Sequence, residues 1–319
     1  MTSRRVIFSL LAVLWLCQGW FQAPVSAIVI RADQSDAAYI ALGASPAYSS
    51  VGMFQGTVPG GGFVASGTLI APDWVLTAAH VVDKAQSMNF TIGGQTYTAD
   101  SWTAYPGWTG NVMAGYDMGL VHLSRPSSVT PAVRYTGGAE LGMTDVTVGY
   151  GKTGNGLTGA LVLDGQKRGA ENTIDTFAAN QRLFLSDFDN PNAVQFGGLG
   201  SSKPLPLEGL IAPGDSGGGV FITTGAGTFL AGVNSFIESS DGKLNSSYGE
   251  IEGQTRVAAF NDWIDTVMKG PLPDVRSDAA AQDDGTLPVS LGNTPEPSTF
   301  ALLAAFGLTM LAWRAFRRA

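Results

Sequence analysis

Three short segments of the sequence carry side chains that together could perform nucleophilic catalysis. His80 ends the segment Trp-Val-Leu-Thr-Ala-Ala-His, Asp117 leads directly into an apolar stretch, and Ser216 stands in Pro-Gly-Asp-Ser-Gly-Gly-Gly. A serine hydroxyl becomes a nucleophile when a histidine takes its proton, and a carboxylate holds that histidine in the correct tautomer. The residue types therefore predict Ser216 as nucleophile, His80 as general base and then acid, and Asp117 as the acid that orients His80.

The glycines around Ser216 add a second element of the same chemistry. They allow backbone N–H groups to approach a developing oxyanion closely, and we expect the N–H groups of Gly214 and Ser216 to be the donors. Each segment alone also has a structural explanation, since a lone histidine is more often structural and an aspartate before a strand often forms a turn. The chain order His, Asp, Ser differs from that of α/β-hydrolases and of subtilisins.

The elements that must position these residues are mostly short strands. Residues 89–98 alternate in polarity on both sides of a Gly-Gly pair at 93–94, which predicts a hairpin. Apolar residues recur at helical spacing only over 257–267, and Gly270 ends that pattern. Strands and helices do not alternate, so an all-β body of antiparallel barrels over residues 28–269, closed by one helix, is favoured over a parallel sheet.

Composition supports a globular, acidic protein. The 319 residues are 45% hydrophobic and 14% charged, and they include 42 glycines, close to twice the usual share of about 7%. Low charge and high apolar content exclude generic disorder for most of the length. The net charge of −8 disfavours a nucleic-acid partner, because phosphate binding needs a basic surface.

The three segments resemble the signatures of the chymotrypsin/trypsin family of serine endopeptidases. The matching motifs are Thr-Ala-Ala-His at 77–80, Asp-Met-Gly-Leu at 117–120 and Gly-Asp-Ser-Gly-Gly at 214–218. Further similarity is found at 66–70, 74–76, 149–151, 232–236 and 255–264. The resemblance implies two six-stranded antiparallel β-barrels, about 28–145 and 146–269, with the active site between them and a C-terminal helix.

The resemblance also implies a function. It assigns the triad His80, Asp117 and Ser216 and the oxyanion donors Gly214 and Ser216 to the hydrolysis of peptide bonds through an acyl-enzyme intermediate. The expected partner is a polypeptide substrate, and no cofactor is expected. The alternative is a non-catalytic surface binding or adhesion protein on the same scaffold, which is disfavoured because all three triad residues are present.

The N-terminus is typical of a secretory signal peptide, residues 1–27. Two arginines precede an apolar run, and the segment ends in Val-Ser-Ala. An uncleaved anchor is the alternative. Cleavage would leave Ile28 as the new first residue, and it would remove Cys17, the only cysteine. The exported chain would then contain no thiol, although exported proteins often rely on disulfides.

In the resembled family, the acid before the nucleophile pairs with a newly formed N-terminal amine. By this resemblance Asp215 is expected to pair with the amine of Ile28, so that removal of the signal peptide would itself activate the enzyme. The alternative is that Asp215 only stabilises its own turn.

The C-terminus, residues 294–319, resembles the PEP-CTERM sorting signal of Gram-negative bacteria. It contains Pro-Glu-Pro at 295–297, an apolar run over 299–313 and a final arginine cluster. The resemblance implies processing by an exosortase-type enzyme, export through the inner membrane, and a periplasmic, cell-surface or secreted location. The tail would attach to the membrane transiently or permanently, and a simple tail anchor is the alternative. Residues 270–293 are expected to form a flexible acidic linker.

The family resemblance also suggests residues for substrate binding. Leu210 would form the floor of the specificity pocket, and Ser235 and Phe236 would lie beside the substrate. Ile237, where the family commonly has glycine, would crowd the pocket and favour small or aliphatic residues before the cleaved bond. Glu252 could instead lie in the pocket wall and attract basic residues.

The remaining polar candidates are expected to be structural. His122 lies on an apolar stretch. With two histidines and no thiol in the exported chain, a zinc site is improbable. Asp187, Asp189 and Asp241 could bind calcium, but we expect them to lie in solvated loops.

Overall fold

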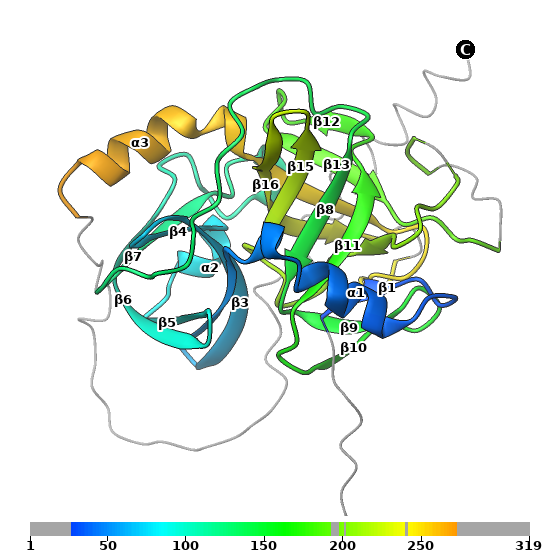
Figure 1. Ribbon diagram of the computed structural model, residues 1–319, viewed down its shortest axis with the longest axis horizontal. Coiled ribbons are helices and arrows are strands. Elements are labelled where there is room, and N and C mark those ends of the chain that lie inside the picture. The colour runs from blue at the N-terminus through cyan, green and yellow to red at the C-terminus, as the bar shows by residue number, and fades with distance from the viewer. Residues whose placement is uncertain (1–26, 193–197, 201, 240–241, 273–319) are drawn as a thin grey trace, which may run out of the picture.

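The computed structural model describes residues 27–192, 198–200, 202–239 and 242–272 (Figure 1). The predicted sorting tail at 294–319, and almost all of the predicted signal peptide and linker, lie outside the described residues. Within the part of the chain that is described, none of the helices is long and apolar enough to cross a membrane.

The first half of the chain forms a closed six-stranded barrel in the order β2-β3-β4-β7-β6-β5. The predicted hairpin is formed by β5 and β6, in which Asn89 pairs with Thr98. Gly93 and Gly94 both have positive φ, +58° and +73°, as a two-residue turn between twisted strands requires. The strands of this barrel are β2 (Val51–Val58), β3 (Gly61–Ala71), β4 (Trp74–Thr77), β5 (Ser87–Ile92), β6 (Gln95–Ala104) and β7 (Gly119–Leu123).

The second half forms a seven-stranded sheet in the order β11-β8-β15-β16-β17-β13-β12. Its strands are β8 (Thr144–Gly149), β11 (Arg168–Thr173), β12 (Thr176–Ala178), β13 (Leu183–Asp187), β15 (Gly219–Thr224), β16 (Gly227–Glu238) and β17 (Ile251–Arg256). The expected all-β class is confirmed, but this half is an open half-barrel and not a closed six-stranded one. Between β11 and β13 the Asn172 side chain donates to the carbonyl oxygen of Asp187 at 3.0 Å, where a closed barrel would have a backbone ladder.

The interiors of the two halves differ in chemistry. The first barrel is filled by apolar side chains such as Phe54 and Phe90, whose ring centroids lie 4.7 Å apart. The second sheet buries polar residues in addition to apolar ones such as Phe184 and Ile222. Thr147 Oγ1 donates to Asn234 Oδ1 at 2.7 Å, and Asn234 Nδ2 donates to the Asp215 carbonyl oxygen at 3.3 Å.

A small third sheet joins the start of the chain to the second half. Its order is β10-β9-β1-β14, and β1 is parallel to β9 and antiparallel to β14. Figure 1 shows β1 and the helix α1 (Asp36–Gly43) beside β9, β10 and β11. These residues therefore lie against the second half although they precede the first barrel. The strands are β1 (Ile28–Ile30), β9 (Lys152–Asn155), β10 (Gly159–Leu163) and β14 (Gly209–Leu210).

The predicted C-terminal helix is α3 (Asn261–Lys269), and the 3-10 turn η3 (Val257–Ala259) precedes it. The helix is tied to the chain between the two halves, because the Arg134 guanidinium donates to Asn261 Oδ1 at 2.7 Å and pairs with Asp265. The other short helical segments are α2 (Ala79–Val82), η1 (Pro46–Tyr48) and η2 (Val112–Ala114).

Candidate active site

His80 and Asp117 lie side by side at one end of the first barrel. His80 is in α2, directly after β4, and Asp117 stands two residues before β7. Because β4 and β7 are paired, their ends bring the two side chains together. His80 Nδ1 lies 2.7 Å from Asp117 Oδ2, and the His80 backbone N–H donates to Asp117 Oδ1 at 2.9 Å. Asp117 is fully buried, and 24% of the His80 side chain is exposed.

A third group fixes the carboxylate from the other half of the molecule. Ser235 Oγ, on β16, donates to Asp117 Oδ2 at 2.5 Å. The sequence pointed to Ser235 only as a substrate-binding residue. In the structure its hydroxyl binds Asp117, which in turn binds His80. This contact joins the two halves of the molecule at the site.

Ser216 stands in a tight turn between β14 and β15. Gly214 and Gly217 on either side have positive φ, +99° and +82°, which side chains with a Cβ rarely adopt. The Gly217 N–H donates to the carbonyl oxygen of Asn234 at 2.8 Å, and Asn234 is the neighbour of the serine that binds Asp117. This hydrogen bond places the turn of Ser216 next to β16, the strand whose Ser235 binds Asp117.

Ser66, on β3 of the first barrel, holds the same turn from the opposite side. Its backbone N–H donates to the Ser216 carbonyl oxygen at 2.8 Å, and its Oγ donates to the Gly214 carbonyl oxygen at 3.0 Å. Its Oγ also accepts from the Tyr150 N–H at 2.9 Å. Sequence reasoning missed this role. The only available signal was a hydroxyl residue within a strand that is buried on this face.

Asp215 is fully buried and is surrounded by backbone donors. Its carboxylate accepts from the N–H groups of Gly151 at 2.7 Å and Ala212 at 2.9 Å, and from the N–H of Ile28. Burial raises the pKa of Asp215 to about 7, although these hydrogen bonds and the charge of Arg168 act in the opposite direction. The structure thus brings the Ile28 N–H to Asp215, and the pairing of a free Ile28 amine with this carboxylate stays a prediction.

The predicted pocket residues are apolar and closely packed. Leu210 is fully buried in a cluster with Val29, Phe188 and Ala212, and Ile237 is packed against this cluster. The ring of Phe236 lies so close to Gly253 that a Cβ there would be 2.2 Å from it, so this glycine makes room for the aromatic ring.

Glu252 lies opposite Ile237 on the neighbouring strand, but its carboxylate makes contacts inside the domain. Its Oε2 accepts from the Ile211 N–H at 2.9 Å, and its Oε1 accepts from Gln254 Nε2 at 2.6 Å. The side chain is fully buried, and burial raises its pKa to about 8. At neutral pH the protonated, uncharged form is therefore favoured.

His122 is held between two acids on the outside of the first barrel. Its Nδ1 lies 2.6 Å from Asp100 Oδ1, its Nε2 lies 3.6 Å from Asp73, and its ring meets Trp74 edge-on with centroids 4.9 Å apart. These contacts fit the structural role that the sequence suggested.

The expectation of solvated loops for the calcium candidates is wrong for two of them. Asp187 is the last residue of β13, and both it and Asp189 are almost completely buried, because the surrounding chain folds over them. Asp241 lies outside the described residues. Among the residues that the structure does describe, no group of three or more His, Cys, Asp or Glu side chains is arranged to hold a metal ion.

Comparison with known proteins agrees with the fold and identifies the family. The trypsin family model matches residues 42–264, and the model of the PEP-CTERM protein-sorting motif matches residues 293–319. Chymotrypsin-like elastase family member 1 of the dog, Canis lupus familiaris, is 26% identical over 219 residues, which cover 63% of this chain and 80% of the relative. The human protein is 25% identical over the same shares.

A structural comparison gives the same architecture. The solved structure of HL collagenase superimposes with a TM-score of 0.53 over 71% of this chain and 96% of the collagenase chain. Because the sequence identity is only 16%, this likeness concerns the fold alone.

Proposed function

The chain belongs to the trypsin family, and from that premise we propose that it is an exported serine endopeptidase that uses Ser216, His80 and Asp117. The observation that carries the proposal is the His80–Asp117 pair, with Nδ1 and Oδ2 at 2.7 Å. Ser235 donates a hydrogen bond to Asp117 of this pair. The pair lies beside the turn that carries Ser216, in which Gly214 and Gly217 have positive φ.

The proposed chemistry follows from these positions. Nε2 of His80 takes the Ser216 proton while Oγ bonds to the scissile carbonyl carbon, and Asp117 stabilises the imidazolium. The tetrahedral intermediate then collapses as His80 gives the proton to the departing amine. A water molecule, deprotonated by the same imidazole, hydrolyses the acyl-enzyme and releases Ser216.

The backbone of the turn supports an oxyanion hole. The carbonyl oxygens of Gly214 and Ser216 are both bound by Ser66. Neither N–H of these two residues donates a hydrogen bond to any other described part of the chain. Two donors on one turn that is held in this way are suited to a developing oxyanion, because they need little reorganisation when the charge forms.

The conformation of Ile28 supports it as the mature first residue. Its φ is +60°, which for a β-branched residue is strained by about 1–3 kcal/mol. The strain is a clash between the Ile28 side chain and the preceding carbonyl, so cleavage after Ala27 would remove it and leave an amine beside Asp215. Sequencing of the exported protein tests this, and a first residue well beyond Ile28 would refute it.

The burial of the cleavage point indicates when cleavage occurs. Ala27, Ile28 and Val29 are all fully buried, so a peptidase could not reach the Ala27–Ile28 bond in the folded chain. We therefore place cleavage during export, before folding, with no separate activation step.

Specificity is proposed to favour small or aliphatic residues before the cleaved bond. Leu210 would offer no counter-charge and Ile237, which packs against the same cluster, would narrow the pocket. The Glu252 carboxylate is bound to Ile211 and Gln254. A peptide library with fixed residues at this position tests the proposal, and a preference for lysine or arginine would contradict it.

The PEP-CTERM motif at 293–319 supports export in a Gram-negative bacterium. We propose processing by an exosortase-type enzyme and a final location in the periplasm, on the cell surface or outside the cell. Attachment to the membrane through the tail stays a prediction, since the tail lies outside the residues that the structure describes.

A fluorophosphonate probe tests the central proposal. The wild-type protein should be labelled, because the probe reacts with an activated serine, and Ser216→Ala should not be labelled. Ser124→Ala is the matched control, since Ser124 is exposed on the surface, and it should be labelled like the wild type. A folded wild-type protein that does not react would refute the enzyme and favour a binding protein on the same scaffold.

A further inference from the structure

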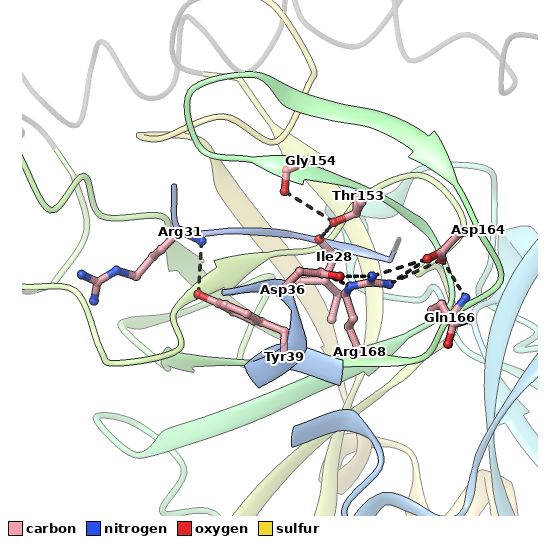
Figure 2. Close-up of polar contacts among 9 residues, drawn as sticks. All are labelled: Ile28, Arg31, Asp36, Tyr39, Thr153, Gly154, Asp164, Gln166 and Arg168. Carbon is pink, nitrogen blue, oxygen red and sulfur yellow. Dashed lines mark hydrogen bonds and ion pairs between the residues drawn. The ribbon is translucent and has the colours of Figure 1, made fainter. Parts of the chain in front are cut away.

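One buried cation connects the N-terminal segment to the second half of the molecule. Arg168, the first residue of β11, is fully buried. Its Nε and Nη2 donate to Oδ1 and Oδ2 of Asp36 at 2.6 and 2.7 Å, and its Nη1 donates to Asp164 at 3.4 Å. Figure 2 shows the guanidinium between the two carboxylates. A bidentate pair of this kind is both strong and directional.

The helix α1 lies across this arginine. Asp36 is its first residue and Gly43 its last. At Gly43 the helix comes so close to the Arg168 backbone that a Cβ would lie 2.5 Å from the carbonyl carbon. One end of α1 is therefore bound to the Arg168 side chain and the other end rests on its backbone.

The helix in turn holds β1. Tyr39 of α1 packs against Ile28 and Ile30 in one buried cluster. Its hydroxyl accepts from the Arg31 N–H at 3.1 Å and donates to the Glu208 carbonyl oxygen at 2.8 Å, and Figure 2 shows Tyr39 reaching from α1 towards Arg31. A displacement of α1 would thus displace the residues that flank Ile28.

We infer that Arg168 and Asp36 form a clamp that positions the new N-terminus at Asp215. This inference rests on the proposed function, because it assigns to the clamp the ordering of the turn that carries Ser216. Asp36 lies outside the family match, which covers residues 42–264, whereas Arg168 lies within it. The clamp supplies a mechanical attachment in addition to the amine–carboxylate pair itself.

The charges around Asp215 favour the same arrangement. Arg168 is the cation whose charge lowers the pKa of Asp215, and Glu252 on β17 is the acid whose pKa is raised by both Asp215 and Glu208. Removing the clamp would both loosen α1 and let the positive charge move. Loosening α1 weakens the docking of a protonated amine at Asp215, and moving Arg168 away removes a charge that favours the ionised form of Asp215.

The alkaline limb of the pH profile of kcat/KM measures this docking. A free α-amine has a pKa of about 8, and docking as a cation raises it. The docked state is therefore fully stable at a pH below the pKa of the free amine. It is lost as the pH rises through the pKa of the docked amine. We expect Asp36→Asn to shift the alkaline limb about one pH unit lower, which corresponds to a tenfold weaker docking equilibrium, with little change in activity near pH 6. Asp36→Glu, which keeps the charge, should shift it less.

The ion pair of Arg134 with Asp265 provides a matched control on α3. The side chains of Asp36 and Asp265 are 36% and 45% exposed, so both Asp→Asn variants should fold. Asp265→Asn should leave the alkaline limb in place. If Asp36→Asn lowers only the melting temperature and does not move the limb, the clamp is structural and the inference is wrong. If the wild type fails to react with fluorophosphonate, the proposed function fails first.

Discussion

At the scale of single residues, the site is a set of hydrogen bonds that converge on two groups. Asp117 is held by His80 and Ser235, and the Ser216 turn is held by Ser66. His80, Asp117 and Ser216 could be singled out from the sequence because each stands in a local motif, and their catalytic roles stay a prediction. The role of Ser66 could not be predicted, because its partner Gly214 is 148 positions away and only the packing of the two halves brings them together.

The Ser66 hydroxyl should matter for turnover more than for substrate binding. Ser66→Ala leaves the Tyr150 N–H and the Gly214 carbonyl oxygen without this partner, so the proposed oxyanion donors lose their alignment. We expect kcat to fall about tenfold, since small misplacements near the reacting atoms can cost up to ~10²-fold, while KM changes little. Steady-state kinetics on a peptide ester measures both.

Thr68→Val is the control for this prediction. Thr68 lies on the same strand and is equally buried, and its Oγ1 has no hydrogen-bond partner among the described residues. It should keep the wild-type kcat. Equal losses in the two variants would show that any change in this strand is harmful, and the specific role of Ser66 would be withdrawn.

At the scale of elements, alternating polarity predicts the strands well, and the hairpin at 89–98 is found where the pattern places it. The helix α1 and the open second sheet were not predicted. The helix has apolar and small residues without a clear stripe, and Arg168 and β11 stabilise it. The gap between the edges of the second sheet depends on side-chain contacts, such as that of Asn172 with the Asp187 carbonyl oxygen. The alternation of apolar and polar residues along a strand cannot reveal such contacts.

The turn between β12 and β13 is a strained element close to the site. Ala179, Asn180 and Gln181 have positive φ of 50°, 54° and 62°. The next residue, Arg182, donates to the Ala114 carbonyl oxygen at 3.0 Å and lies over the Tyr116 ring at 4.2 Å. The turn thus supports the loop that leads to Asp117, and its left-handed conformation is maintained by contacts between the two halves.

Replacing Gln181 by glycine should stabilise the protein. A left-handed conformation costs a residue with a Cβ roughly 1–2 kcal/mol, and the greater entropy of glycine in the unfolded chain offsets part of the gain. We expect Gln181→Gly to raise the free energy of unfolding by about 0.5–1 kcal/mol in urea denaturation. Gln86→Gly, at an exposed position without positive φ, should lower it. A decrease in both variants would contradict the assignment of strain.

At the scale of the whole molecule, the unexpected feature is the number of buried acids in the second half. Burial raises the pKa of Glu252 to about 8, of Glu208 to about 7 and of Asp189 to about 6, and it raises that of Asp145 well above its usual value. The sequence suggested solvated loops for Asp187 and Asp189. Acidic residues are usually exposed, so composition and spacing could not reveal this polar interior.

These acids should make the protein less stable as pH rises from about 5 to about 8. Over this range the folded protein keeps protons that the unfolded chain has already released. The stabilisation by these protons is complete at a pH below the pKa values of the acids in the unfolded chain. It is lost as the pH rises through their pKa values in the folded protein. Each proton held in excess lowers the free energy of unfolding by about 1.4 kcal/mol per pH unit. Urea denaturation at pH 5, 6, 7 and 8 measures the slope.

Glu252→Gln should reduce this slope, because the amide does not titrate and can still contact Ile211 and Gln254. Asp262→Asn, at an exposed position on α3, serves as the control and should leave the slope unchanged. A free energy of unfolding that rises steadily over this range would show that the buried acids are ionised in the folded protein.

The central position of β1, between β9 and β14, has a practical consequence for producing the enzyme. An affinity tag or an initiator methionine ahead of Ile28 would turn the terminal amine into an uncharged amide, which could not form the proposed ion pair with Asp215. Recombinant protein should therefore start at Ile28. This terminus can be produced by removing a leader peptide in the host, or a cleavable fusion partner, before the chain folds. Purification tags belong after residue 272.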